Sequence, residues 1–191
     1  VPVLRDVADL YEAVAEERGI ALALDLPARL FFYGDRSLVQ QAVANMLDNA
    51  IKFSPPGGTV YLRAHLRESA PGRLAGPTGE GMLDLSVSDE GIGMSEADMA
   101  RATERFFRAE KARNTPGSGL GLSMVRAIVQ LHGGQMHLSS HAPGLTVSLA
   151  LPVAASALAE AEAELSPSAH ISGMTQTSPL PHQHDTNSSV E

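Results

Sequence analysis

The stretch Asp89-Glu90-Gly91-Ile92-Gly93-Met94 places one carboxylate and two glycines directly after an alternating apolar run. A carboxylate only accepts hydrogen bonds, so Asp89 in a dry pocket would receive one from an exocyclic amine such as that of adenine. Guanine would present a carbonyl oxygen there, and two opposed acceptors would disfavour that base. Gly91 and Gly93 let the backbone lie close to a ligand. A tight turn without any ligand explains the stretch equally well.

A second polar group lies on an expected helix from about residue 38 to 52. Successive helical residues turn by about 100°, which brings four polar side chains within about 80° of arc: Gln41, Asn45, Asn49 and Lys52. Asparagine is a mediocre helix former, so two asparagines one turn apart require a reason other than helix propensity. Amide oxygens suit Mg²⁺, and a lysine ammonium suits phosphate oxygens. An ordinary polar stripe on a surface helix is the alternative.

A third group is the glycine-rich stretch Gly117-Ser118-Gly119-Leu120-Gly121-Leu122, at the expected N-terminus of a helix. Free backbone N–H groups and the helix dipole favour phosphate there. Its G-x-G-x-G spacing differs from the dinucleotide-binding and P-loop patterns, and the chain lacks the signature set of Ser/Thr protein kinases. The preceding residues 101–113 carry five basic and two acidic side chains, in a chain of net charge −8. They supply the positive charge that an anionic ligand requires, unless they form a solvated charge run.

These residues must be positioned by a small set of helices and strands. Apolar residues at helical spacing predict helices over residues 4–18, 38–52 and 119–132, and a capping-box pattern predicts a short helix after Ser95. Asp35 or Ser37 is expected to cap the second helix. Alternating apolar residues predict strands over residues 20–26, 60–66, 83–87, 135–139 and 146–151. Residues 69–81 are rich in glycine and proline, which favours an exposed connection.

Length and composition narrow the class of protein. The 191 residues allow one well-buried domain, and the chain has no cysteine and no apolar run approaching the ~18 residues of a membrane span. The net charge of −8 argues against general nucleic-acid binding. Residues 1–152 are expected to form the domain, and residues 153–191, rich in Ala and Glu and then in Ser, Pro and His, a disordered tail. The start at Val1 without a signal-peptide pattern suggests a piece of a longer protein.

Four stretches, in this order, resemble the boxes of the C-terminal ATP-binding catalytic domain of sensor histidine kinases, in the gyrase, heat-shock-chaperone and MutL-type ATPase superfamily. They are NMLDNAIKFS at residues 45–54 (N box), DEGIGM at 89–94 (G1 box), ERFFR at 104–108 (F box) and GSGLGL at 117–122 (G2 box). The resemblance covers roughly residues 4–152. It implies an α/β fold of the Bergerat type, a two-layer sandwich with a mixed sheet of about five strands and helices on one face.

The resemblance also implies which residues meet the metal and the phosphates of ATP. Asn49 would ligate Mg²⁺ with Asn45 beside it, and Lys52 would meet phosphate. Arg108 and Lys111 would reach the phosphates from a lid. The glycines of the G2 box would hinge that lid and offer backbone N–H groups, within the run Gly117, Ser118, Gly119, Leu120, Gly121 and Leu122. The two phenylalanines of ERFFR are expected to pack the lid onto the domain.

For the base, the resemblance implies a pocket built from the N and G1 boxes. Phe53 would pack on the adenine, and Asp89 would accept its amine. The adjacent wall would be formed by Gly91, Ile92 and Gly93. Thr146 resembles a late threonine of the family near the base, although the usual Gly-Thr pair is here Leu145-Thr146.

The phosphoacceptor of such a kinase is a histidine in a separate helical dimerisation domain, and none of the seven histidines here has that setting. The resemblance therefore implies the ATP-handling half of a protein-histidine kinase, which would phosphorylate a dimerisation domain absent from this chain for relay to a response regulator. The full-length protein is expected to be a homodimer in the bacterial inner membrane. This domain is expected on the cytoplasmic side, without direct membrane contact.

Two other functions stay open from the sequence. The chain could be a nucleotide-binding regulatory module without phosphotransfer, or a hydrolytic ATPase of the same superfamily. Hydrolytic relatives carry a glutamate as the general base where this helix has Asn45. Because an amide cannot take that proton, slow intrinsic ATP hydrolysis is expected.

Overall fold

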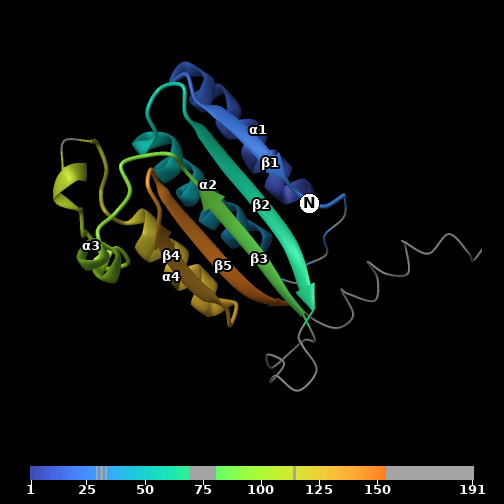
Figure 1. Cartoon of the computed structure of the whole chain (residues 1–191). Coiled ribbons are helices and arrows are strands. Elements are labelled where there is room, and N and C mark those ends of the chain that lie inside the picture. The colour runs from blue at the N-terminus through green and yellow to red at the C-terminus, as the bar shows by residue number, and fades with distance from the viewer. Residues whose placement is uncertain (29, 31, 33, 69–80, 114, 154–191) are drawn as a thin grey trace, which may run out of the picture.

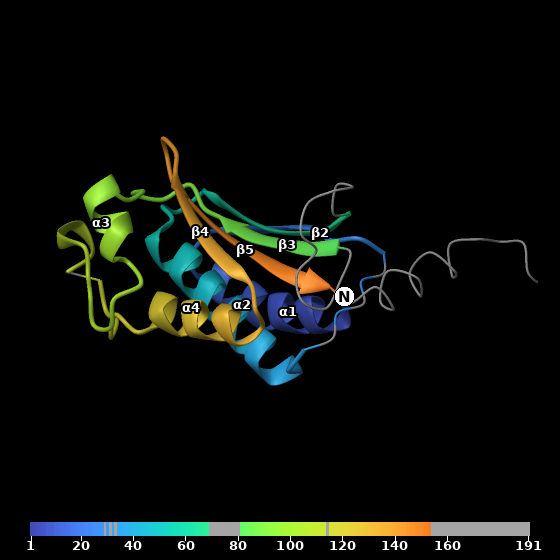
Figure 2. The same ribbon diagram turned by 90° about the horizontal axis from the view of Figure 1, so that it is seen from below.

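The computed structural model describes residues 1–153 except 29, 31, 33, 69–80 and 114. Five strands form one sheet in the order β1-β2-β3-β5-β4: β1 (Ala21–Asp25), β2 (Thr59–Glu68), β3 (Gly81–Ser88), β4 (Gln135–Ser140) and β5 (Leu145–Val153). β1 pairs with β2 in parallel, and the other neighbours are antiparallel, so the sheet is mixed. The three long helices cover one face of it (Figures 1 and 2): α1 (Pro2–Glu17), α2 (Arg36–Phe53) and α4 (Gly121–Leu131). The expected two-layer α/β fold is confirmed.

The core lies between the sheet and this helical layer. On β3, Leu83, Leu85 and Val87 are buried, and they alternate with Asp84 and Ser86 on the other face. The same alternation buries one side of β2 and of β5, as expected for strands with one solvated face. Apolar residues at helical spacing on α2 are buried against the sheet: Ala42, Val43, Met46, Leu47 and Ala50.

The ends of the helices follow local capping chemistry. Asp35 is the N-cap of α2, and its side chain accepts a hydrogen bond from the backbone N–H of Leu38 at 3.0 Å. Of the two candidates Asp35 and Ser37, the residue that caps α2 is therefore Asp35. α1 ends where Gly19 takes φ +67°, a left-handed conformation that glycine adopts without steric cost. Ser95 caps the short helix α3 (Glu96–Arg101) by accepting from the backbone N–H of Asp98, as the capping-box pattern predicted.

Three details differ from the sequence-based expectations. α4 begins at Gly121 rather than at 119, because the two preceding glycines have positive φ values that are incompatible with a helix. β5 continues to Val153, one residue beyond the expected domain boundary, because its side chain is buried in the core. Phe106 of ERFFR is 70% exposed, with φ +65°, and does not pack the lid onto the domain as expected.

The segment between α3 and α4 lies beside one end of the sheet and contains a short 3-10 turn, η1 (Glu110–Ala112) (Figure 1). Of the expected connection over residues 69–81, residues 69–80 lie outside the described residues, and so do residues 154–191 of the expected tail. Within the part of the chain that is described, no helix combines the length and the apolar character needed to cross a bilayer.

Candidate functional site

Two adjoining cavities lie where α2, the segment between β3 and α4, and the beginning of α4 meet. Several residues line both of them: Asn49, Phe53, Met94, Ala109, Ala112 and Leu122. The first cavity extends toward the end of β3 and the start of β5, and the second toward the start of α4. One elongated ligand could therefore occupy both.

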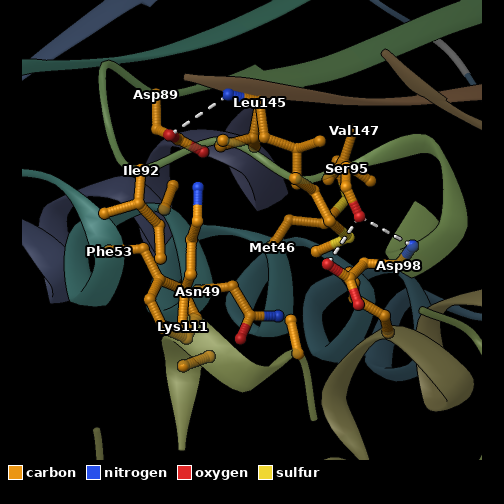
Figure 3. Close-up of a pocket in the computed structure, with 17 residues that line it drawn as sticks. Met46, Asn49, Phe53, Asp89, Ile92, Ser95, Asp98, Lys111, Leu145 and Val147 are labelled. Carbon is orange, nitrogen blue, oxygen red and sulfur yellow. Dashed lines mark hydrogen bonds between the residues drawn. The ribbon is translucent and has the colours of Figure 1, made fainter. Parts of the chain in front are cut away.

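The first cavity is mostly apolar, and Asp89 is the carboxylate at its inner end (Figure 3). Its other walls include Met46, Ile92, Leu145 and Val147. Asp89 is only 7% exposed. Burial raises the pKa of its carboxyl group, and hydrogen bonds from the backbone of Gly91 and Leu145 partly oppose this shift. A buried acceptor in an apolar cavity selects a ligand with a matching donor.

Backbone donors hold only one oxygen of this carboxylate. Asp89 Oδ1 accepts from the N–H of Gly91 at 2.8 Å and from the N–H of Leu145 at 3.3 Å. Among the described residues, no hydrogen bond to Oδ2 is found. This second oxygen is therefore available to a donor on a ligand.

Gly91 allows the turn after Asp89 to lie against the end of α2. A side chain at this position would overlap the carbonyl group of Phe53. The turn and the C-terminal end of α2 therefore form one continuous wall, with Phe53 and Ile92 facing the same cavity (Figure 3).

The second cavity is polar and carries the positive charge. It is lined by Asn45, Asp48, Lys52, Arg108 and the glycines at 117, 119 and 121. Partial burial lowers the pKa of Lys52, and the nearby positive charge of Arg108 adds to the effect while Asp48 opposes it. A partly desolvated ammonium of this kind interacts strongly with an anion.

α4 presents its N-terminus to this cavity. Its N-cap is Leu120, which makes no side-chain capping bond within the described structure, and its first turn has no acidic residue. The first backbone N–H groups of the helix are thus left to a ligand or to water. A Cβ at Gly121 would lie 3.1 Å from Asn49 Nδ2, so the first turn of α4 lies close against the polar side chains of α2.

The amide of Asn45 has no partner of its own. Its Nδ2 is buried and makes no hydrogen bond to any described residue. Its oxygen Oδ1 lies on the side of Gly121, 3.8 Å from the position of a Cβ there, and Gly121 lines the second cavity. The described residues contain no cluster of three or more His, Cys, Asp or Glu side chains that could hold a metal alone. Two amides beside a phosphate site nevertheless fit Mg²⁺, which uses few protein ligands and takes others from phosphates and water.

A comparison with known families gives this geometry its context. Residues 34–155 match the family described as histidine kinase-, DNA gyrase B-, and HSP90-like ATPase. The chain belongs to this family. The chain is 43% identical over 112 residues to the signal transduction histidine-protein kinase/phosphatase MprB of Mycobacterium sp. strain KMS. This alignment covers 59% of this chain and 20% of MprB. The chain spans about a fifth of the length of the first curated relatives that it matches.

Solved structures of histidine kinases share the fold of this ATPase domain. A mycobacterial sensor histidine kinase MprB aligns with 32% identity and a TM-score of 0.64, covering 79% of this chain and 96% of that one. Full-length ShkA in complex with AMPPNP aligns with 28% identity and a TM-score of 0.65, covering 82% of this chain and 30% of ShkA.

In this ATPase domain, the structure brings most of the sequence-predicted residues to the two cavities. Asp89, Ile92 and Gly93 line the first cavity, whereas Gly91 stands behind it against α2. Asn49 and Phe53 lie between the cavities. The second cavity takes the remaining predicted residues of the N and G2 boxes, except Leu120: Asn45, Lys52, Gly117, Ser118, Gly119, Gly121 and Leu122.

Two basic residues of the ATPase domain are placed differently from the expectation. Lys111 lines the first cavity and not the second, because η1 folds over the apolar end of the site. Arg108 lines the second cavity, but its guanidinium donates to the backbone carbonyls of Ala112, at 2.7 Å, and Arg113, at 3.0 Å. Arg108 therefore orders the segment before the G2 box in addition to supplying charge.

Thr146 does not line either of the two cavities in the described structure. Its neighbours Leu145 and Val147 line the first cavity, and successive side chains of a strand point to opposite faces. Leu145 thus takes the place beside Asp89 where the sequence comparison suggested a threonine. The residue pair Leu145-Thr146 was visible in the sequence, but its orientation depends on the register between β5 and β3.

Sequence reasoning also missed several apolar wall residues. Met46, Met94 and Val147 line the first cavity. Met46 and Val147 are also buried members of the core. The available signal was their position in the sequence, since Met46 precedes Asn49 by about one helical turn and Val147 directly follows Thr146.

Proposed function

We propose that this ATPase domain binds Mg-ATP and transfers the γ-phosphoryl group to a histidine of a dimerisation domain outside this chain. The observation that carries the proposal is the pairing of the two cavities. A buried carboxylate lies in an apolar cavity, and a cationic, glycine-lined cavity adjoins it. A purine nucleotide matches this arrangement, because its flat base suits the apolar cavity and its anionic phosphates suit the cationic one. Membership of the family and the histidine kinases among the relatives support the reading.

In this proposal the adenine occupies the first cavity. Phe53 packs on the base, Asp89 Oδ2 accepts a hydrogen bond from its amine, and Ile92 and Gly93 form the adjacent wall. Lys111 closes the outer side of the same cavity. Guanine would bring a carbonyl oxygen to Asp89, leaving two buried acceptors in opposition.

The phosphates then lie in the second cavity. The ammonium of Lys52 and the uncapped N-terminus of α4 supply positive charge and N–H donors there. Ser118 and the surrounding glycines let the backbone approach the phosphate oxygens. The amides of Asn49 and Asn45 would hold Mg²⁺, which, when bound, neutralises phosphate charge as it develops.

The acceptor imidazole supplies the nucleophile, so this chain needs no general base for water. A bond forms between the imidazole nitrogen and the γ-phosphorus while the bond to the β–γ bridging oxygen breaks, and ADP leaves. The contribution of the domain is to bind, align and neutralise the reacting groups. Asn45 cannot accept a proton from water as a glutamate could, so ATP hydrolysis stays slow.

The same proposal names the partners and the location. The phosphorylated histidine passes its phosphoryl group to the receiver domain of a response regulator. The full-length protein is a homodimer in the bacterial inner membrane, with this domain on the cytoplasmic side. The chain's small share of its relatives' length agrees with further domains in the full protein.

A transfer assay tests the proposal. The chain is mixed with γ-labelled Mg-ATP and the histidine-bearing dimerisation domain of its own full-length protein. We expect acid-labile label on that domain, and none when its histidine is replaced by alanine. ATP binding without transfer would instead support a regulatory module. Multiple-turnover phosphate release without transfer would support a hydrolytic ATPase.

A further inference from the structure

A small polar network lies directly behind Asp89, at the turn between β4 and β5. Ser88 Oγ lies 2.8 Å from Thr146 Oγ1, and His141 Nε2 lies 3.2 Å from each of these oxygens. The other ring nitrogen of His141, Nδ1, lies 2.6 Å from the carbonyl oxygen of Pro143. Neither the family resemblance nor the proposed function uses His141.

The partner of Nδ1 determines the tautomer of the ring. A carbonyl oxygen only accepts, so Nδ1 carries the hydrogen and donates it to Pro143. In the neutral imidazole, Nε2 is then an acceptor and takes a hydrogen from a hydroxyl of Ser88 or Thr146. The remaining hydroxyl hydrogen bridges the two oxygens. Every donor in the network thus has an acceptor inside it, and the turn is tied to the end of β3.

This turn also determines how Asp89 is held. Ser88 precedes Asp89, and Thr146 follows Leu145, so the network brackets the contact between those two residues. Asp89 N–H donates to the carbonyl of Leu145 at 3.0 Å, and Leu145 N–H donates back to Asp89 Oδ1 at 3.3 Å. A side chain at Gly144 would overlap the carbonyl of Asp89, so the turn lies against the backbone of Asp89 without space between them.

We propose that His141 is a positioning residue for base recognition. It lines neither cavity of the described structure, so it would not touch a nucleotide that occupies them. By tying the β4–β5 turn to Ser88, it holds Leu145 N–H against Asp89 Oδ1, which leaves Oδ2 directed at the base. This inference rests on the proposed function, because it assumes that the ligand of the first cavity is the base of ATP. The exposed His141 side chain contributes no core packing that would otherwise explain the network.

The test measures affinity for two nucleotides by titration calorimetry. ATP has the 6-amino group that Asp89 would contact, and purine riboside 5′-triphosphate lacks it. We expect His141→Ala to weaken ATP binding about fivefold to tenfold, the loss of about one buried hydrogen bond. The affinity for the purine analogue should stay within about twofold, because that ligand makes no contact whose loss His141 could cause. In an Asp89→Asn background, His141→Ala should have no further effect on ATP.

A second variant and a control complete the design. Ser88→Ala breaks the same network without removing the ring and should reproduce the selective loss for ATP. His137→Ala is the matched control, because His137 is an exposed histidine of β4 without a hydrogen bond to any described residue. Equal losses for both nucleotides, or additive losses with Asp89→Asn, would overturn the inference and indicate general destabilisation.

These measurements, together with the transfer assay, distinguish a failure of the proposed phosphotransfer from a failure of the proposed role of His141. Wild-type protein that binds ATP but transfers no phosphoryl group would refute phosphotransfer, while the ratio between the two nucleotides would still decide the role of His141. Wild-type protein that binds neither nucleotide would overturn both proposals.

Discussion

At Asp89, the backbone N–H groups of Gly91 and Leu145 take one carboxylate oxygen and leave the other for a ligand. A carboxylate that was free on both sides could rotate to find another partner. Here one oxygen is already committed, so the direction of the second is determined before any nucleotide arrives. Such preorganisation reduces the entropy lost on binding.

Replacing Asp89 by asparagine tests its role in choosing the base. We expect Asp89→Asn to weaken ATP binding at least tenfold, because the charge-assisted hydrogen bond to the adenine amine is lost. The preference for ATP over GTP should also disappear, since the amide can rotate to offer an N–H to the guanine carbonyl. Titration calorimetry with both nucleotides measures this, and an unchanged preference would contradict the assignment.

The buried state of Asp89 also predicts a dependence on pH. The ionised carboxylate is the better acceptor, and burial raises its pKa. As the pH falls, Asp89 therefore becomes protonated earlier than an exposed aspartate, whose pKa is about 3.9. ATP affinity should fall with decreasing pH, beginning above that ordinary value.

The control for this pH experiment is Asp89→Asn. Its ATP affinity should vary in this range only as far as the nucleotide itself titrates. A wild-type affinity that follows the same curve as the variant would show that ionisation of Asp89 is not involved.

Among the elements, α2 contributes most to the site. One side of it packs in the core, while Asn45, Asn49 and Lys52 face the second cavity and its last residue, Phe53, borders both cavities. Its start depends on one side chain, that of Asp35. The helix that carries the polar residues is thus fixed at its N-terminus by a cap and along its length by apolar contacts.

Asp35→Ala tests this cap. Loss of the bond to the Leu38 N–H should reduce the free energy of unfolding by about 1 kcal/mol, measured by urea denaturation at an unchanged slope. Ser37→Ala is the matched control, because Ser37 is an exposed polar residue of the same turn that does not cap the helix. Equal effects of the two substitutions would contradict the assignment of the cap to Asp35.

At the scale of the whole molecule, the site lies beside the ends of several helices and strands. The end of β3, the start of β5, the last turn of α2 and the first turn of α4 all meet there. Three of these ends carry a box, the G1 box after β3, the N box on α2 and the G2 box before α4, while the start of β5 carries none. The sheet and its helical layer therefore act as a scaffold that gathers four short segments.

The sequence by itself determined the elements, the buried faces and the family. Helical and strand periodicities, caps and glycines act over a few residues, so they could be read directly, as the buried side of α2 and the cap at Ser95 illustrate. The family boxes likewise identified most residues that line the two cavities. These features depend on local spacing alone.

Only the tertiary structure decided the strand order, the parallel pairing of β1 with β2, and the orientation of residues near the base. Leu145 faces the cavity and Thr146 faces away because of the register between β3 and β5, and a shift of one residue would exchange them. The position of Lys111 depends on the fold of η1, and the link from His141 to Asp89 spans residues more than fifty apart. Such relations arise from long-range pairing, which no short stretch of sequence encodes.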